Sequence, residues 1–65
     1  MAQWHRIVDS WDETTLYVLR DDRRVYAEVS DEPTARQTEQ LADTWGVSVA
    51  DGIVDVMAFM GVEGG

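Results

Sequence analysis

Acidic side chains recur at a spacing of four residues in the second half of the sequence. Glu39 and Asp43 form one pair, and Asp51 and Asp55 form a second. On a helix, residues at this spacing share one face about 5–6 Å apart at Cβ, and a like-charged pair costs a few tenths of a kcal/mol. Closely spaced negative charges on a rigid surface are also what DNA presents. The candidate partner-binding residues are therefore Glu39, Asp43, Asp51 and Asp55, with Asp31 and Glu32 at the rim.

Residue types that perform catalysis are sparse. The absence of Cys excludes thiolate chemistry and Cys-based zinc sites. His5 is the only histidine and has no second soft ligand near it in sequence. Asp9, Asp12 and Glu13 lack the glycine-containing spacing of a calcium loop and fit a turn. The serines have no histidine base in a recognised arrangement, and no phosphate-binding loop is present. We expect no enzymatic activity, no metal and no cofactor.

The charge of the chain is strongly negative and unevenly distributed. Thirteen acids face five bases, all arginine, for a formal net charge of −8. Residues 31–65 carry seven acids and one base, Arg36, whereas residues 1–30 carry six acids and four arginines. A field of this sign repels nucleic acid and anionic membranes and attracts basic grooves. It also suits the solvated surface of a protein from a salt-loving host, so composition leaves both interpretations open.

The first half of the chain has the alternation of β-strands. Val25, Ala27 and Val29 fall on one side of a predicted strand, with Tyr26 and Glu28 on the other. Two further strands are predicted in the stretches WHRIVDSW and TTLYVLR. Turn residues in WDET and RDDR leave connections too short for crossovers, which predicts an antiparallel meander. One face of this sheet should meet the helices. The other is left for a second subunit or as an exposed patch.

The second half has helical spacing. The stretch SDEP is a start signal with Pro33 in the first turn, Leu41 and Trp45 recur on one face, and Gly46 ends the helix. Ser48 with a following acid resembles a capping box for a second helix. An apolar stripe then follows at Val49, Ile53, Val56, Met57 and Met60. Trp45 and Ile53 are the predicted core contacts between the two helices.

The second helix has a competing interpretation. The stretch GIVDVMAF also fits a buried strand, and Gly52 inside a helix costs about 1 kcal/mol relative to Ala. We nevertheless predict an α+β fold with a three-stranded antiparallel sheet followed by two α-helices (βββαα). The chain is then a single domain, with a β-meander over 1–30, a helix-turn-helix pair over 31–61 and a flexible tail over 62–65.

The stretch 37–57 resembles the helix pair of ribbon-helix-helix proteins. The resemblance rests on residues that set helix packing, namely Leu41, Ala42, Gly46, Val47 and Ser48. It implies that bases are read from the preceding strand and phosphates are held at the start of the second helix. Here the strand offers Arg24, Tyr26 and Glu28, and Asp51 lies near the second helix start. Phosphate contacts normally come from several Lys or Arg residues, so we expect no direct DNA binding.

In size, acidity and lack of catalytic residues, the chain resembles the phage-encoded anti-CRISPR proteins that act on type I surveillance complexes as DNA mimics. This resemblance concerns overall character and has no residue motif behind it. It implies an inhibitor that occupies a basic nucleic-acid-binding groove and blocks recognition of target DNA. The alternatives are a ribbon-helix-helix-like dimerising antitoxin or transcriptional co-regulator, and a small halophilic domain of another role.

The length of the chain allows one domain with a thin core, which a partner or a homodimer would help to stabilise. No apolar run approaches the roughly 18 residues of a membrane span, and the charged first residues do not form a signal peptide, so we expect a cytoplasmic protein. Trp4 and Trp11 are equally consistent with core positions and with interface anchors.

Overall fold

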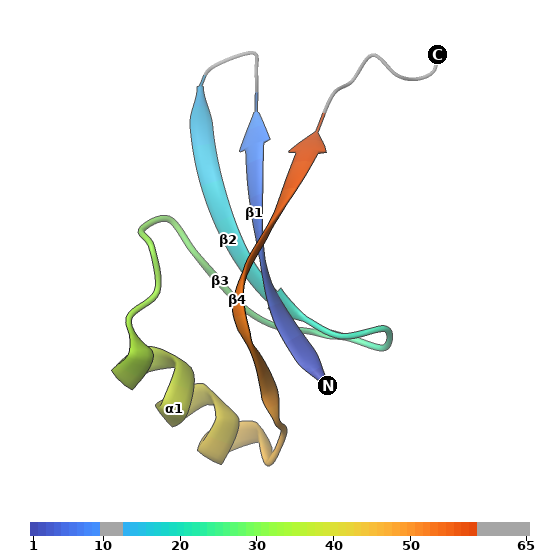
Figure 1. Ribbon diagram of the computed structural model, residues 1–65, viewed down its shortest axis with the longest axis vertical. Coiled ribbons are helices and arrows are strands. Elements are labelled where there is room, and N and C mark those ends of the chain that lie inside the picture. The colour runs from blue at the N-terminus through green and yellow to red at the C-terminus, as the bar shows by residue number, and fades with distance from the viewer. Residues whose placement is uncertain (10–12, 59–65) are drawn as a thin grey trace.

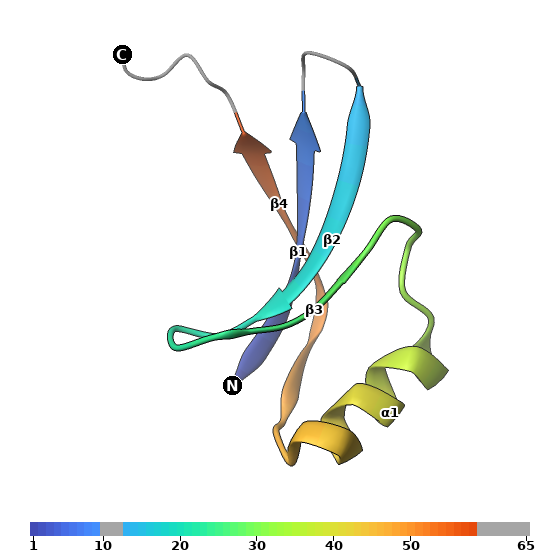
Figure 2. The ribbon, with the colours of Figure 1, turned by 180° about the vertical axis from the view of Figure 1, so that it is seen from behind.

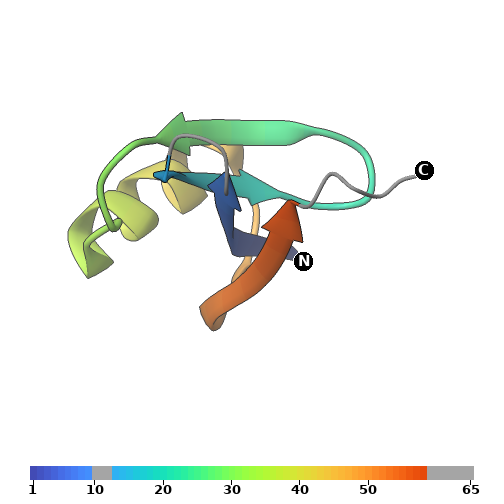
Figure 3. The ribbon, with the colours of Figure 1, turned by 90° about the horizontal axis from the view of Figure 1, so that it is seen from above.

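A computed structural model describes residues 1–9 and 13–58. Its elements are β1 (Ala2–Asp9), β2 (Thr14–Arg20), β3 (Val25–Val29), α1 (Ala35–Trp45) and β4 (Val49–Ala58). The strands form one sheet in the order β3-β2-β1-β4 (Figure 1). Neighbours are antiparallel within β1–β3, and β4 is parallel to β1. α1 connects the two edge strands and lies on one face of the sheet (Figures 2 and 3).

The first three strands form the meander that the alternation predicts. The hairpin between β2 and β3 is closed by Asp21, whose Oδ1 accepts hydrogen bonds from the backbone N–H groups of Arg23 and Arg24 at 2.7 and 3.1 Å. Oδ2 of the same carboxylate accepts a hydrogen bond from the Tyr26 hydroxyl. These contacts hold the pKa of Asp21 at about 2, with the Tyr26 hydrogen bond as the largest cause. The hairpin is thereby fixed by one ionised side chain.

The predicted second helix is wrong, and with it the βββαα fold and the helix-turn-helix pair over 31–61. Residues Val49–Ala58 form β4, a strand that pairs along β1. Gly52 has φ 84°, a left-handed value that glycine adopts without strain. It lies at a bulge where the register jumps from Ala2↔Val49 to Trp4↔Ile53. A glycine that weakens a helix therefore suits an irregular strand, and the β-branched residues after it favour the extended backbone.

α1 begins later than the sequence signal suggests. Its N-cap is Thr34, whose Oγ1 accepts a hydrogen bond from the backbone N–H of Gln37 at 3.0 Å. The Gln37 Oε1 in turn accepts one from the Thr34 N–H at 2.9 Å, which completes a capping box. Pro33 therefore precedes the cap instead of lying in the first turn. Gly46 ends the helix with φ 66°, as predicted. Ser48 does not cap a helix, because the chain enters β4 at Val49; the Ser48 carbonyl oxygen accepts a hydrogen bond from the backbone N–H of Ala2.

The core lies between α1 and the sheet and is small. Its buried members are Ala2, Trp4, Tyr17 and Leu19. Partly buried side chains surround this cluster, and α1 contributes no fully buried residue. The core prediction is therefore wrong for Trp45, which is 41% exposed and stacks edge-to-face on Tyr26 with Arg24 5.5 Å from its ring centroid. Ile53 does pack against the cluster, but from a strand.

Trp4 is a core residue, with 3% of its surface exposed. Trp11, Met60 and the predicted tail over 62–65 lie outside the described residues. α1, the helix of the described part of the chain, is too short and too polar to cross a membrane.

Candidate partner-binding surface

The segment leading into α1 and the helix itself carry four of the predicted acids. Asp31 and Glu32 are exposed in the connection that follows β3, and Glu39 and Asp43 are exposed on the helix. Both helix ends are capped, so the two helical carboxylates project from a backbone held at each end. The predicted spacing of Glu39 and Asp43 on one helix is thus confirmed.

A groove of about 370 Å³ separates α1 from β4. Glu39 lines it from the helix, and Asp51 lines it from the strand. Trp4 lies between them, and its indole Nε1 donates a hydrogen bond to Thr38 Oγ1 at 3.0 Å. The structure therefore brings Glu39 and Asp51 to the same groove, although Asp51 does not share a helix face with Asp55.

Asp51 is positioned by the bulge in β4. The Gln3 side-chain Nε2 donates to the carbonyl oxygen of Gly52 at 2.9 Å and lies 3.5 Å from that of Asp51. These contacts anchor the backbone on either side of the bulge to β1. The carboxylate of Asp51 remains exposed beside the groove.

Asp55 differs from the other acids because a base faces it. Its register partner on β1 is Arg6, and Arg6 Nε donates to Asp55 Oδ1 at 2.5 Å. That hydrogen bond lowers the pKa of Asp55 and raises the pKa of Arg6. The side chains are 63% and 40% exposed, respectively, so water screens the pair. The charge of Asp55 is thus already partnered, and the predicted Asp51–Asp55 helical pair is not formed.

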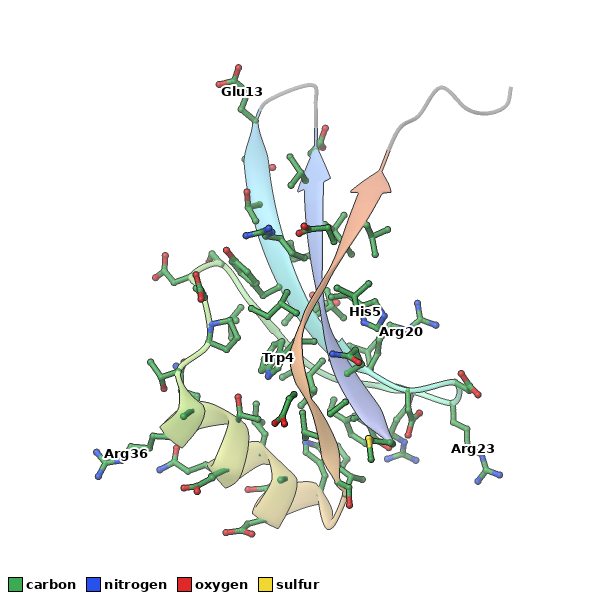
Figure 4. The ribbon with its side chains drawn as sticks, in the orientation of Figure 1. Trp4, His5, Glu13, Arg20, Arg23 and Arg36 are labelled. Atoms are coloured by element: carbon green, nitrogen blue, oxygen red, sulfur yellow. The ribbon has the colours of Figure 1, made fainter. Side chains whose placement is uncertain are left out.

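The bases of the chain lie apart from this groove. Arg36, the single base of residues 31–65, extends from α1 away from the sheet (Figure 4). Arg20 and Arg23 lie at the β2–β3 hairpin end of the molecule (Figure 4), where His5 and Arg20 line the same shallow pocket. We use the name acidic flank for the exposed, unpartnered carboxylates of the helix side, namely Asp31, Glu32, Glu39, Asp43 and Asp51. No ion pair joins these carboxylates to a base within the described residues.

Sequence reasoning missed the role of β1 in this surface. Trp4 and Thr38 form the link between sheet and helix beside the groove, and Arg6 removes Asp55 from the set of free acids. One signal was available, because Trp4 and Arg6 are two residues apart and must share a face of their strand. The identity of that face, and of the strand beside it, depends on pairing between residues 49 apart in the chain.

No known family model matches the chain, and neither a characterised protein nor a solved structure matches it.

Proposed function

We propose that the protein is an acidic inhibitor that docks its acidic flank onto a basic, nucleic-acid-binding groove of another macromolecule. The observation that supports this proposal is the grouping of five exposed carboxylates on α1, the connection before it and the first part of β4, with Arg36 as the only base in that half of the chain. Glu39 and Asp51 lie on opposite walls of one groove, so the relative position of these two carboxylates is set by the fold.

Electrostatics favours this kind of partner. Carboxylates held on capped or hydrogen-bonded backbone need little ordering when they meet a rigid basic surface. Arg and Lys side chains in a DNA-binding groove are held close together, and a negative protein relieves their mutual repulsion as phosphates do. Opposite fields also speed the encounter of the two molecules and make it salt-dependent.

The resemblance to small anti-CRISPR proteins suggests the target. We propose that the flank covers the surface of a type I CRISPR surveillance complex that recognises target DNA, in the cytoplasm of the host cell. The protein itself should not bind nucleic acid, because its net charge is −8.

The decisive experiment is competition for one partner. A fluorescent target duplex is bound to a purified type I surveillance complex, and displacement by the protein is followed by anisotropy at several salt concentrations. We expect displacement that weakens as salt rises. Retention of the duplex at saturating protein would overturn the proposed function. A gel shift of duplex DNA by the protein alone would instead favour the repressor-like alternative.

Matched variants locate the contact. The triple change Glu39→Gln, Asp43→Asn and Asp51→Asn removes three charges from the acidic flank. The control removes three exposed carboxylates elsewhere, by Glu13→Gln, Asp22→Asn and Glu28→Gln. Displacement should weaken much more in the first variant. Equal weakening in the two variants would mean that net charge acts without a defined docking surface.

A further inference from the structure

The face of the sheet opposite α1 has an apolar centre. Cross-strand pairing places Val18, His5 and Val54 in one row across β2, β1 and β4. The next row holds Leu16, Ile7 and Val56. We call the apolar members of these rows the open-face patch: Ile7, Leu16, Val18, Val54 and Val56. No helix or strand of the described residues covers it (Figure 3).

Three side chains of the patch expose much more of their surface than core residues do. Leu16 and Val56 are each 38% exposed, and Val54 is 45% exposed. Val18, by contrast, is only 5% exposed although it lies outside the helix-side core cluster. Neighbouring side chains of its own face therefore shield it. The patch is a packed apolar centre with a rim that water reaches, which is the anatomy of an interface.

The charges at the two ends of this face have opposite signs. Glu13 lies at the end where β2 begins, and Arg20 and Arg23 lie at the hairpin end (Figure 4). Asp9 shares the Glu13 end, because it pairs with Thr14. At the hairpin end, the Asp21 carboxylate is occupied by hydrogen bonds from Tyr26 and the backbone. Asp22 is exposed there as well, so the two arginines outnumber the one remaining carboxylate. The face is therefore polarised along its strands, and the acidic flank lies on the far side of the sheet.

We propose that a second copy of this chain covers the open-face patch, in an antiparallel homodimer related by a two-fold axis perpendicular to the strands. Such an axis lays the Val18–Val54 row of one copy over the Leu16–Val56 row of the other. It also brings the Arg20 end of each copy onto the Glu13 end of its partner. In a two-fold dimer each contact occurs twice, so the opposite charges at the two ends of one chain complement those of its partner at both ends of the interface.

The size of the face matches such a contact. The molecule measures 38 by 23 Å in its two longest directions, and Figure 1 looks along the shortest one onto the strands. These extents include α1, and the four-stranded face alone is roughly 19 Å wide and 23 Å long from the usual strand spacing and rise. A face of several hundred Å² reaches the lower end of the range of specific interfaces, whose standard size is roughly 800 Å² per partner. Only five hydrophobic side chains of the described residues are buried, and a small domain with so thin a core gains stability from association. The dimer leaves both acidic flanks on the outside, away from one another.

Sedimentation equilibrium of the full chain over a range of micromolar concentrations tests the proposal. We expect a species of twice the 7.3 kDa chain mass. Val56→Lys places a charge in the patch and should weaken dimerisation by about tenfold or more. Val8→Lys is the matched control, because Val8 is 39% exposed but shares the opposite face with Trp4 and Arg6. A chain that stays monomeric at every concentration, or two lysine variants with equal effects, would overturn the proposal.

A charge exchange tests the antiparallel arrangement. Arg20→Glu and Glu13→Arg should each weaken dimerisation, since each places like charges together at both ends of the interface. The chain that carries both changes has its polarity reversed, and its dimerisation should return toward that of the parent. Circular dichroism of each variant checks that the sheet is retained. A double variant that dimerises less well than either single variant would contradict the antiparallel packing.

Discussion

Arg6 and Asp55 face each other across the parallel strands β1 and β4, with Arg6 Nε 2.5 Å from Asp55 Oδ1. The two residues are 49 positions apart in the chain, so their contact reports that β4 has joined the sheet. The hydrogen bond from Arg6 lowers the pKa of Asp55 in the folded state. Asp55 therefore contributes stability above its unfolded pKa, and that contribution is lost as the pH falls through the lowered folded pKa.

The first prediction concerns this pair and pH. Asp55→Asn should lower the midpoint of chemical denaturation slightly at neutral pH and have no effect at a pH below the lowered pKa of folded Asp55, where the parent carboxyl is protonated as well. The effect is small because both side chains are exposed. Denaturation curves at the two pH values provide the measurement. A larger difference between parent and variant in acid than at neutral pH would contradict the ion pair.

Asp21 should show a stronger acid dependence. Its pKa falls from 3.8 to about 2 because the Tyr26 hydroxyl and two backbone N–H groups donate to the carboxylate. The stability that it contributes is complete above pH 3.8 and disappears as the pH falls toward about 2. Asp21→Asn should thus destabilise the chain at neutral pH, and the two proteins should converge in strong acid. Asp22→Asn, which alters the neighbouring exposed acid, is the control and should be nearly neutral.

Trp4 and Trp45 should differ sharply in their contribution to stability. Trp4 is 3% exposed and donates a hydrogen bond to Thr38, so Trp4→Ala should cost about 3–5 kcal/mol. Trp45 is 41% exposed, and Trp45→Ala should cost about 1 kcal/mol, a typical value for a point substitution. Urea denaturation followed by circular dichroism compares the two. The helix-side core would be wrongly assigned if the Trp45 variant were the less stable.

Gly52→Ala distinguishes a strand from a helix by the sign of its effect. The space around Gly52 is open, so an added Cβ meets no atom within 4 Å. The cost comes from φ 84°, which L-residues rarely adopt, and should be about 1–2 kcal/mol. In a helix the same substitution would stabilise by about 1 kcal/mol. A rise in melting temperature would restore the predicted second helix.

Residues 49–58 show why only part of the secondary structure could be predicted from the sequence. Val25, Ala27 and Val29 alternate with polar or aromatic neighbours and match one period only, so their strand was predictable. Val49, Ile53 and Val56 recur at helical spacing, while Val54 and Val56 alternate with Asp55 as a strand would. Both patterns fit, and the decision comes from pairing with β1, a contact that no local window contains.

In the candidate surface, too, the positions set by local structure were predicted correctly, and those set by strand pairing were not. Glu39 and Asp43 were correctly placed together because a capped helix is a local structure. Asp51 and Asp55 were wrongly paired, because their relative position depends on the bulge at Gly52 and on the register with β1. Arg6 could not be recognised as the partner of Asp55 without that register.

The parallel pairing of β1 with β4 also sets an order of assembly. The β1–β3 meander contains only contacts between consecutive strands, and it can form while the rest of the chain is still being synthesised. β4 must wait until α1 has crossed from one edge of the sheet to the other, and such non-local pairing is slow. During that interval β1, which carries the core residue Trp4, is an unprotected edge strand. The nascent chain is therefore most prone to misassociation just before β4 pairs with β1.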